Sequence, residues 1–222
     1  MIFNTLDFHT QFVEGSNAAS RRFRVHINYI VDSFSLRIPR RIETRLFHKL
    51  NVLVGYERCG PVFWHLDGIG NVELVSAPIR SIYRATAAEQ VKSVKGYLRR
   101  GIRVAAKRDR HFGRHLKLWE HLLSTVDEEF DHDFRMSRSH RSRRWRCDAV
   151  LRITPTAYHY DVLVKDSKSL EVIQRHRIKT TECAYPFFRG IGFSKLLWEG
   201  EDIVGFTSEN KEVFRFATGL VR

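Results

Sequence analysis

The segment from Thr86 to Lys107 constrains the fold most, because it carries both a helix-start signal and a long apolar stripe. Thr86 and Glu89 have the spacing of a capping box, in which each side chain bonds the backbone N–H of the other residue. Apolar residues then recur at helical spacing, with Lys and Arg between them. The stripe consists of Val91, Val94, Leu98, Ile102 and Ala105. A helix with such a stripe has to bury it, so the pattern predicts a helix packed in a globular core.

A second helix is predicted from Phe112 to Val126. Its apolar residues also recur at helical spacing: Leu116, Trp119, Leu122, Leu123 and Val126. The short connection favours antiparallel packing of the two helices as a helical hairpin. Because both stripes are continuous, we interpret this hairpin as structural core and not as a cofactor site.

The N-terminal part gives two further patterns. Arg22 to Val31 alternates apolar and polar residues, which predicts a strand. Pro39 suits the first turn of a helix. Apolar residues at every fourth position after it predict that this helix ends near Asn51, and they are Ile42, Leu46 and Leu50.

Turn signals divide most of the remaining chain into strands. Pro61 to Ala77 is typical of a hairpin, because the glycines of Asp67-Gly68-Ile69-Gly70 supply the positive φ that a tight turn needs. Six more strands are predicted at 150–153, 158–164, 170–178, 193–198, 203–207 and 213–216. Short turns favour antiparallel pairing. The predicted fold class is therefore α+β, with mainly antiparallel sheet, a helical hairpin and one further helix.

Length and composition limit the kind of protein. We expect residues 1–222 to form a single domain that allows two subdomains, 1–126 of mixed α/β structure and 145–222 of mostly β structure. No apolar run is long enough to span a membrane, and the N-terminus lacks a secretory signal pattern. Three cysteines far apart in the chain argue against a disulfide framework. These features predict a cytoplasmic protein.

The charge is unusual and suggests a partner. The 38 Lys and Arg residues against 25 Asp and Glu residues give a net charge of +13. Such a chain favours a polyanion or an acidic protein surface. An acidic patch stands directly before a run of six arginines from Arg135 to Arg146. The candidate partner-binding residues are Asp127, Glu128, Glu129, Asp131, Asp133, Arg138, Arg141, Arg143, Arg144 and Trp145.

Recognisable enzyme signatures are missing. The sequence has no dinucleotide-binding, phosphate-loop or nucleophile-elbow motif. His111 and His115 are spaced four apart, as metal ligands on a helix can be, but the residue after His111 is Phe112 and not the glutamate of a zincin. Buried, inert thiols are the default interpretation of Cys147 and Cys183. We therefore predict a protein without catalytic residues, metal or cofactor.

The sequence contains one nuclease-like arrangement of carboxylates. Asp148 and Asp161 lie on or beside predicted strands, and Glu171 begins the next one. Metal-dependent nucleases place two carboxylates and a lysine on such a sheet, usually with the spacing (D/E)-x-K. Here Ile173 stands two residues after Glu171, and Lys165 follows Asp161 by four. The motif is broken.

The layout of the first half resembles a known family. The matching segments are Ile27 to Pro39, Arg45 to Gly55, Asp67-Gly68-Ile69 and Leu98 to Ile102. They resemble the immunity proteins encoded beside polymorphic toxins, especially those of contact-dependent growth inhibition. The resemblance implies a cytosolic α+β protein without catalytic activity that binds one toxin domain tightly.

Two functions remain open from the sequence. The first is a cytoplasmic immunity protein that neutralises the C-terminal domain of a cognate toxin by occluding its active site. The alternative is a nucleic-acid-binding or degenerate nuclease-like protein that uses the basic stretch from Arg135 to Arg146. Weak, non-specific nucleic-acid binding is also compatible with the first function.

Overall fold

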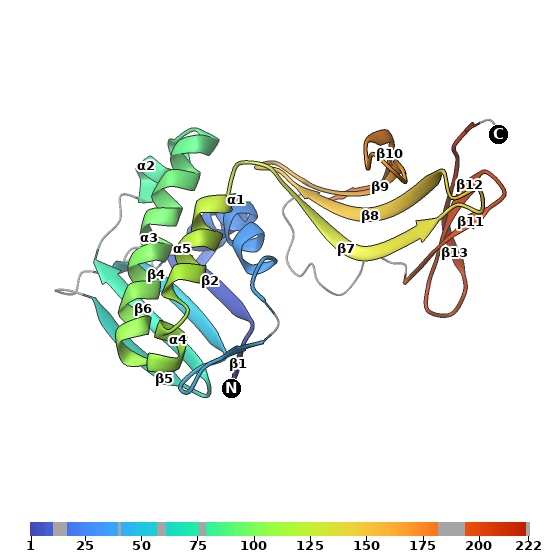
Figure 1. Ribbon diagram of the computed structural model, residues 1–222. Coiled ribbons are helices and arrows are strands. Elements are labelled where there is room, and N and C mark those ends of the chain that lie inside the picture. Colours follow the sequence, from blue (N-terminus) through green and yellow to red (C-terminus); the bar gives the residue numbers. More distant parts are fainter. Residues whose placement is uncertain (11–16, 40, 57–60, 76–78, 182–193, 221–222) are drawn as a thin grey trace. The chain divides into compact units, whose positions relative to one another are not determined.

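The computed structural model describes residues 1–10, 17–39, 41–56, 61–75, 79–181 and 194–220. The fold class is α+β, with mostly antiparallel sheets. The chain forms two compact units, Met1–Glu128 and Glu129–Arg222. Figure 1 labels their elements.

The first unit contains a four-stranded sheet in the order β2-β4-β6-β5. β2, β4 and β6 run parallel to one another, whereas β5 pairs antiparallel with β6 and forms an edge. A separate small ladder joins β1 to β3. The strands are β1 (Ile2–Phe3), β2 (Thr5–Thr10), β3 (Ile42–Glu43), β4 (Lys49–Tyr56), β5 (Val62–Leu66) and β6 (Ile69–Val75).

Helices pack on this sheet, with α3 closest to its centre (Figure 1). Gly101 of α3 faces β4, where an added Cβ would lie 2.5 Å from Cγ2 of Val52. The absence of a side chain at Gly101 therefore allows the close approach of helix and strand. The helices are α1 (Asn17–Ser35), α2 (Ile79–Arg84), α3 (Ala87–Arg108), α4 (Arg110–Gly113) and α5 (Leu116–Thr125).

An aromatic cluster lies under the helices. The rings of Phe112 and Trp119 stack at 4.9 Å, and the ring of Phe3 lies 5.2 Å from Phe112 and 5.3 Å from Trp119. All three side chains are almost fully buried. The β1 strand and the helices that follow α3 are thus joined through one core.

A buried carboxylate fixes the chain between α3 and α4. Oδ1 of Asp109 accepts hydrogen bonds from the backbone N–H groups of His111 and Phe112, and Oδ2 accepts from those of Arg45 and Leu46. Burial raises the pKa of this carboxyl, but the four N–H donors outweigh burial and hold the pKa below its usual value. Asp109 caps α4 and ties it to the loop after β3.

The second unit consists of two antiparallel sheets, in the orders β10-β9-β8-β7 and β11-β12-β13. One core joins them: Cys147, Ala149, Val162 and Val164 of the larger sheet pack with Leu196 and Ile203. The strands are β7 (Phe130–Ser139), β8 (Trp145–Ile153), β9 (Tyr158–Asp166), β10 (Val172–Thr181), β11 (Lys195–Glu199), β12 (Asp202–Phe206) and β13 (Glu212–Ala217).

Several elements confirm the expectations from sequence. The capping box of Thr86 and Glu89 is formed, and α3 begins directly after it. The β5–β6 hairpin is formed, but its positive φ angles belong to Asp67 and Gly68, at 50° and 75°, and not to Gly70, which lies within β6. The strands expected in the second half are also present as β8 to β13.

Two N-terminal predictions are wrong. Arg22 to Val31 is part of α1 and not a strand. Residues 27–31 are all buried, so the helix is enclosed on nearly every side there and its apolar period carries little information. The helix predicted after Pro39 is also wrong, because β3 and the start of β4 occupy that stretch. Its four-residue spacing comes from two strands separated by a loop.

The remaining differences are smaller. The second helix begins at Leu116, and Phe112 belongs to the separate short helix α4. Strand β2 and the parallel pairing of β2, β4 and β6 were not expected. Strand β7 was not predicted either, because its acidic residues were interpreted as a charged patch, although Phe130, His132 and Phe134 alternate with polar residues there.

Candidate functional site: a basic helical face

The positive charge is concentrated in the first unit. Residues 1–128 contain 21 Lys and Arg against 12 Asp and Glu, a net charge of +9. Residues 129–222 contain 17 against 13, a net charge of +4. Most of the excess therefore lies outside the arginine run of the second unit.

The richest segment runs from the last residue of α2 to the start of α5. Residues 84–117 contain eleven basic residues and only two acidic ones, Glu89 and Asp109. Glu89 is engaged in the capping box and Asp109 is buried as the cap of α4. The basic residues are Arg84, Lys92, Lys95, Arg99, Arg100, Arg103, Lys107, Arg108, Arg110, Arg114 and Lys117.

Five of these side chains share one face of α3. At 100° per residue, they fall within an arc of roughly 100°, and they extend over about 22 Å of the helix at 1.5 Å per residue. They are Lys92, Arg99, Arg100, Arg103 and Lys107. The name basic helical face is used below for these five and for the exposed basic residues that follow them along the chain, Arg108, Arg110, Arg114 and Lys117.

Few carboxylates neutralise the basic helical face. Glu120 of α5 forms ion pairs with Arg99 and Arg103, each at 2.7 Å. The hydrogen bond from Arg99 is the main reason why the pKa of Glu120 is lowered. Across the described residues, the other members of the face form no ion pair with a carboxylate. Their charge is available to a ligand.

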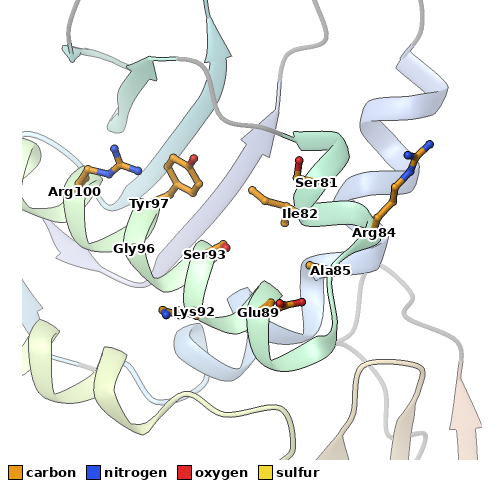
Figure 2. Close-up of a pocket in the computed structure, with 10 residues that line it drawn as sticks. All are labelled: Ser81, Ile82, Arg84, Ala85, Glu89, Lys92, Ser93, Gly96, Tyr97 and Arg100. Carbon is orange, nitrogen blue, oxygen red and sulfur yellow. The ribbon is translucent and has the colours of Figure 1, made fainter.

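A cavity of about 660 Å³ lies at one end of the face, between α2 and α3. Figure 2 shows Tyr97 and Arg100 side by side on one side of it and Ile82 of α2 on another. The guanidinium of Arg100 lies 4.5 Å from the centre of the Tyr97 ring. The lining residues are Ser81, Ile82, Arg84, Ala85, Glu89, Lys92, Ser93, Gly96, Tyr97 and Arg100.

The acidic candidates from the sequence are divided between the units. Asp127 and Glu128 end the first unit, whereas Glu129, Asp131 and Asp133 belong to the second. Intramolecular partners occupy these last three. Glu129 pairs with Arg152, Asp131 lies 3.0 Å from Arg175, and Asp133 accepts a hydrogen bond from the backbone N–H of Arg135.

The basic candidates gather around the turn between β7 and β8. Arg138, Arg141, Arg143 and Arg144 are exposed there. The guanidinium of Arg144 lies 4.5 Å from the centre of the Trp145 ring. Arg144 therefore covers one face of Trp145, the aromatic member of the candidate partner-binding residues. The turn forms a second, smaller basic surface.

The nuclease-like residues lie on the polar face of the β7–β10 sheet. Asp148 and Asp161 are buried, and the register places them on the same face because Asp161 pairs with Val150. Lys165 and Arg146 both contact Asp148 at 2.8 Å. Burial raises the pKa of Asp148, but contacts from Lys165, Ser137 and Arg146 outweigh it and lower the pKa overall.

Asp161 also forms ion pairs with two cationic side chains. Arg175 lies 2.7 Å from it, and Arg177 forms a second ion pair. Glu171 is exposed, outside β10, and does not join the two aspartates. A (D/E)-x-K motif would place an acid two residues before Lys165. That position is occupied by Leu163, which pairs with Asp148 across the two strands. The polar face therefore presents ion pairs and not a paired-carboxylate centre.

Other candidate ligands are also placed. His111 lies in α4 and His115 caps α5, so the expectation that both lie on one helix is wrong. Among the described residues, no three His, Cys, Asp or Glu side chains are arranged to hold a metal ion. Cys147 is buried, which raises the pKa of its thiol to about 12. Cys59 and Cys183 lie outside the described residues.

The basic helical face was missed from the sequence. From the sequence, the Lys and Arg residues of α3 were expected only to lie between its apolar positions, and partner binding was predicted for the arginine run at 135–146 instead. The ratio of eleven basic to two acidic residues over 84–117 was the available signal.

The comparisons add no relative. No protein-family model, no curated protein and no solved structure matches the chain. Within the described residues, no helix has the length and apolar character required to cross a bilayer.

Proposed function

We propose that the protein binds nucleic acid in the cytoplasm through the basic helical face and catalyses no reaction on it. The observation that carries the proposal is the excess of eleven basic over two acidic residues at 84–117, with both acids engaged in helix caps. A solvated helix normally mixes both signs of charge, and a stripe of one sign attracts a polyanion.

The binding mechanism follows from the side chains. Each Lys or Arg that contacts a phosphate displaces a condensed counterion, and this release supplies most of the binding free energy. One arginine guanidinium can also donate two parallel hydrogen bonds to the oxygens of a phosphate. The exposed arginines around the β7–β8 turn provide a second contact of the same kind. This mechanism requires no metal or cofactor.

Charge reversal tests the proposal. We expect the double variant Lys107→Glu/Lys117→Glu to bind a labelled 12-base-pair DNA duplex at least about tenfold more weakly, and its salt slope to fall by about 0.9 for each lost phosphate contact. Both lysines are exposed and form no ion pair in the described chain. Fluorescence anisotropy between 50 and 200 mM salt, roughly the range over which such contacts weaken, measures both.

A matched control separates location from net charge. Lys168→Glu/Lys179→Glu makes the same change in charge at exposed sites of the second unit. This control should keep most of the affinity. Equal losses in the two double variants, or no loss in either, would contradict binding through the basic helical face.

Inhibition of a toxin domain is the second candidate, and the edge strand β5 favours it. Val62, Trp64 and Leu66 alternate along β5 and are 36%, 42% and 63% exposed. Among the described strands, β6 alone pairs with β5, so its outer edge is open. An open edge with an apolar row suits a partner protein that adds a strand and covers the aromatic anchor.

The second candidate has its own test. Leu66→Asp removes the most exposed apolar side chain of the row without touching the basic helical face. Isothermal titration with the C-terminal domain of a neighbour-encoded toxin should show tight 1:1 binding that this substitution weakens. Absence of binding to that domain by the wild-type protein would reject toxin inhibition and leave the nucleic-acid proposal intact.

A further inference from the structure

We infer that the cavity between α2 and α3 receives one nucleotide of a single strand, so that the protein prefers single-stranded to duplex nucleic acid. This inference rests on the proposed function and concerns one end of the basic helical face. Charge alone would not distinguish a single strand from a duplex. The inference adds a ligand class, an unpaired nucleotide, that does.

The size of the cavity fits such a ligand. Its volume of about 660 Å³ falls within the range of roughly 300–1,000 Å³ typical of small-molecule sites. The floor is apolar, because Ile82 and Tyr97 line it and are only 3% and 9% exposed. An apolar floor suits the face of a nucleobase better than a hydrated phosphate.

Arg100 provides a stacking surface. Its guanidinium lies over the Tyr97 ring at 4.5 Å, and the side chain as a whole is exposed. The Tyr97 ring is itself buried and packs near Phe8, with the ring centres 6.1 Å apart. Unpaired bases stack on arginine planes as well as on aromatic rings. A base entering the cavity can therefore continue the stack of Tyr97 and Arg100 (Figure 2).

The charges at the rim define where the phosphate goes. Lys92 and Arg100 line the cavity from the same face of α3. Glu89 also lines it, but its carboxylate accepts hydrogen bonds from the backbone and the hydroxyl of Thr86, both at 2.9 Å. Arg84 extends away from the other lining side chains (Figure 2). The phosphate is therefore drawn to Lys92 and Arg100 and kept away from Glu89.

Gly96 is the second, independent observation. Glycine is unfavourable in a helix interior, so its presence calls for a reason. At Gly101 of the same helix the reason is contact with Val52, but a Cβ at Gly96 would meet no atom of the described residues within 4 Å. Packing does not require Gly96. The lack of a side chain at Gly96 does leave the cavity wall open where a ligand would approach the helix backbone.

A duplex has no unpaired base to place in the cavity. Its bases are paired and stacked, and extruding one costs free energy. Duplex nucleic acid is thus expected to bind through its phosphates to the basic helical face alone. A single strand adds the base in the cavity.

Filling the cavity tests the inference. The variant Gly96→Leu should weaken binding of a labelled 12-nucleotide oligothymidine by about tenfold, the typical value of one base stack, and leave binding of a 12-base-pair duplex unchanged. Leucine is a better helix former than glycine, so thermal unfolding should confirm a folded variant. Anisotropy at one fixed salt concentration measures both probes.

Arg100→Lys is the companion variant, because it keeps the charge and removes the stacking plane. Because Arg100 also belongs to the basic helical face, both probes should lose some affinity, and the single strand should lose more than the duplex by about the value of one base stack. Single-strand affinity within about twofold of wild type in both variants would overturn the inference, since one base stack is worth more than that. Equal loss for both probes would also overturn it. Duplex binding that depends on Lys107 and Lys117 would meanwhile keep the proposed function standing.

Discussion

The two units use their charged residues in opposite ways. On the α3 face of the first unit, the exposed cations pair with no carboxylate of the described residues apart from Glu120. On the polar sheet face of the second unit, Asp148 and Asp161 are buried and each contacts two cations. Charge that is left unpaired at a surface is available to a ligand, whereas charge paired in the fold serves structure.

The buried carboxylates extend this comparison. Asp109 of the first unit is held by four backbone N–H groups, whereas the aspartates of the sheet are held by side-chain cations. Backbone donors cannot turn to solvent when their acceptor is removed. Long cationic side chains that are partly exposed can do so.

The largest effect is therefore expected at Asp109. Replacement by Ala leaves up to four N–H groups without an acceptor in a nearly fully buried site, and we expect a loss of about 3 kcal/mol or more in the free energy of unfolding. Urea denaturation followed by circular dichroism measures it. A loss below about 1 kcal/mol would show that water replaces the carboxylate readily.

Asp161→Asn should have a smaller effect. The substitution removes the charge that Arg175 and Arg177 contact, but these side chains are 28% and 43% exposed and can regain water. We expect a loss of about 1–3 kcal/mol, below the value for a fully enclosed pair. The same urea experiment applies. A loss as large as that of Asp109→Ala would contradict the distinction between backbone and side-chain partners.

Acid pH should affect both kinds of carboxylate. The pKa values of Asp109 and Asp148 are lowered in the folded protein, so the unfolded chain takes up protons first as the pH falls. Their stabilisation is fully present well above the unfolded value of about 3.9 and is lost as the pH falls through the folded pKa. Unfolding free energy measured from pH 6 down to about pH 2.5 should decline mostly below about pH 4.

A variant tests whether Asp148 causes part of this decline in stability at acid pH. Asp148→Asn should flatten the decline, because its amide does not titrate in that range. An unchanged profile in Asp148→Asn would mean that the aspartate does not contribute to acid unfolding. The comparison uses the same buffers and the same probe for both proteins.

The sequence predicted the elements whose signal is local. The capping box at Thr86 and the glycine turn after Asp67 depend on neighbouring residues, and both are formed. The failures concern tertiary context. The residues of α1 from Ile27 to Val31 are all buried, which hid the helical period, and β4 gained its parallel neighbours from distant segments.

The candidate site was predictable in composition but not in geometry. The excess of basic residues at 84–117 can be counted from the sequence. The cavity beside Gly96 cannot, because it depends on how α2 packs against α3. The pairing of Lys165 with Asp148 likewise depends on the register of β8 and β9.

The smallest change in the free energy of unfolding is expected at Gly96, one of the two glycines of α3. Gly96→Ala should raise the free energy of unfolding by about 0.5–1 kcal/mol, because alanine restricts the unfolded chain and its Cβ meets nothing within 4 Å. Gly101→Ala should lower it by about 1–3 kcal/mol, since its Cβ would lie 2.5 Å from Cγ2 of Val52. Paired urea titrations of the two variants give both signs. If Gly96→Ala also destabilised the protein, the cavity would be closed in solution and Gly96 would be a packing residue like Gly101.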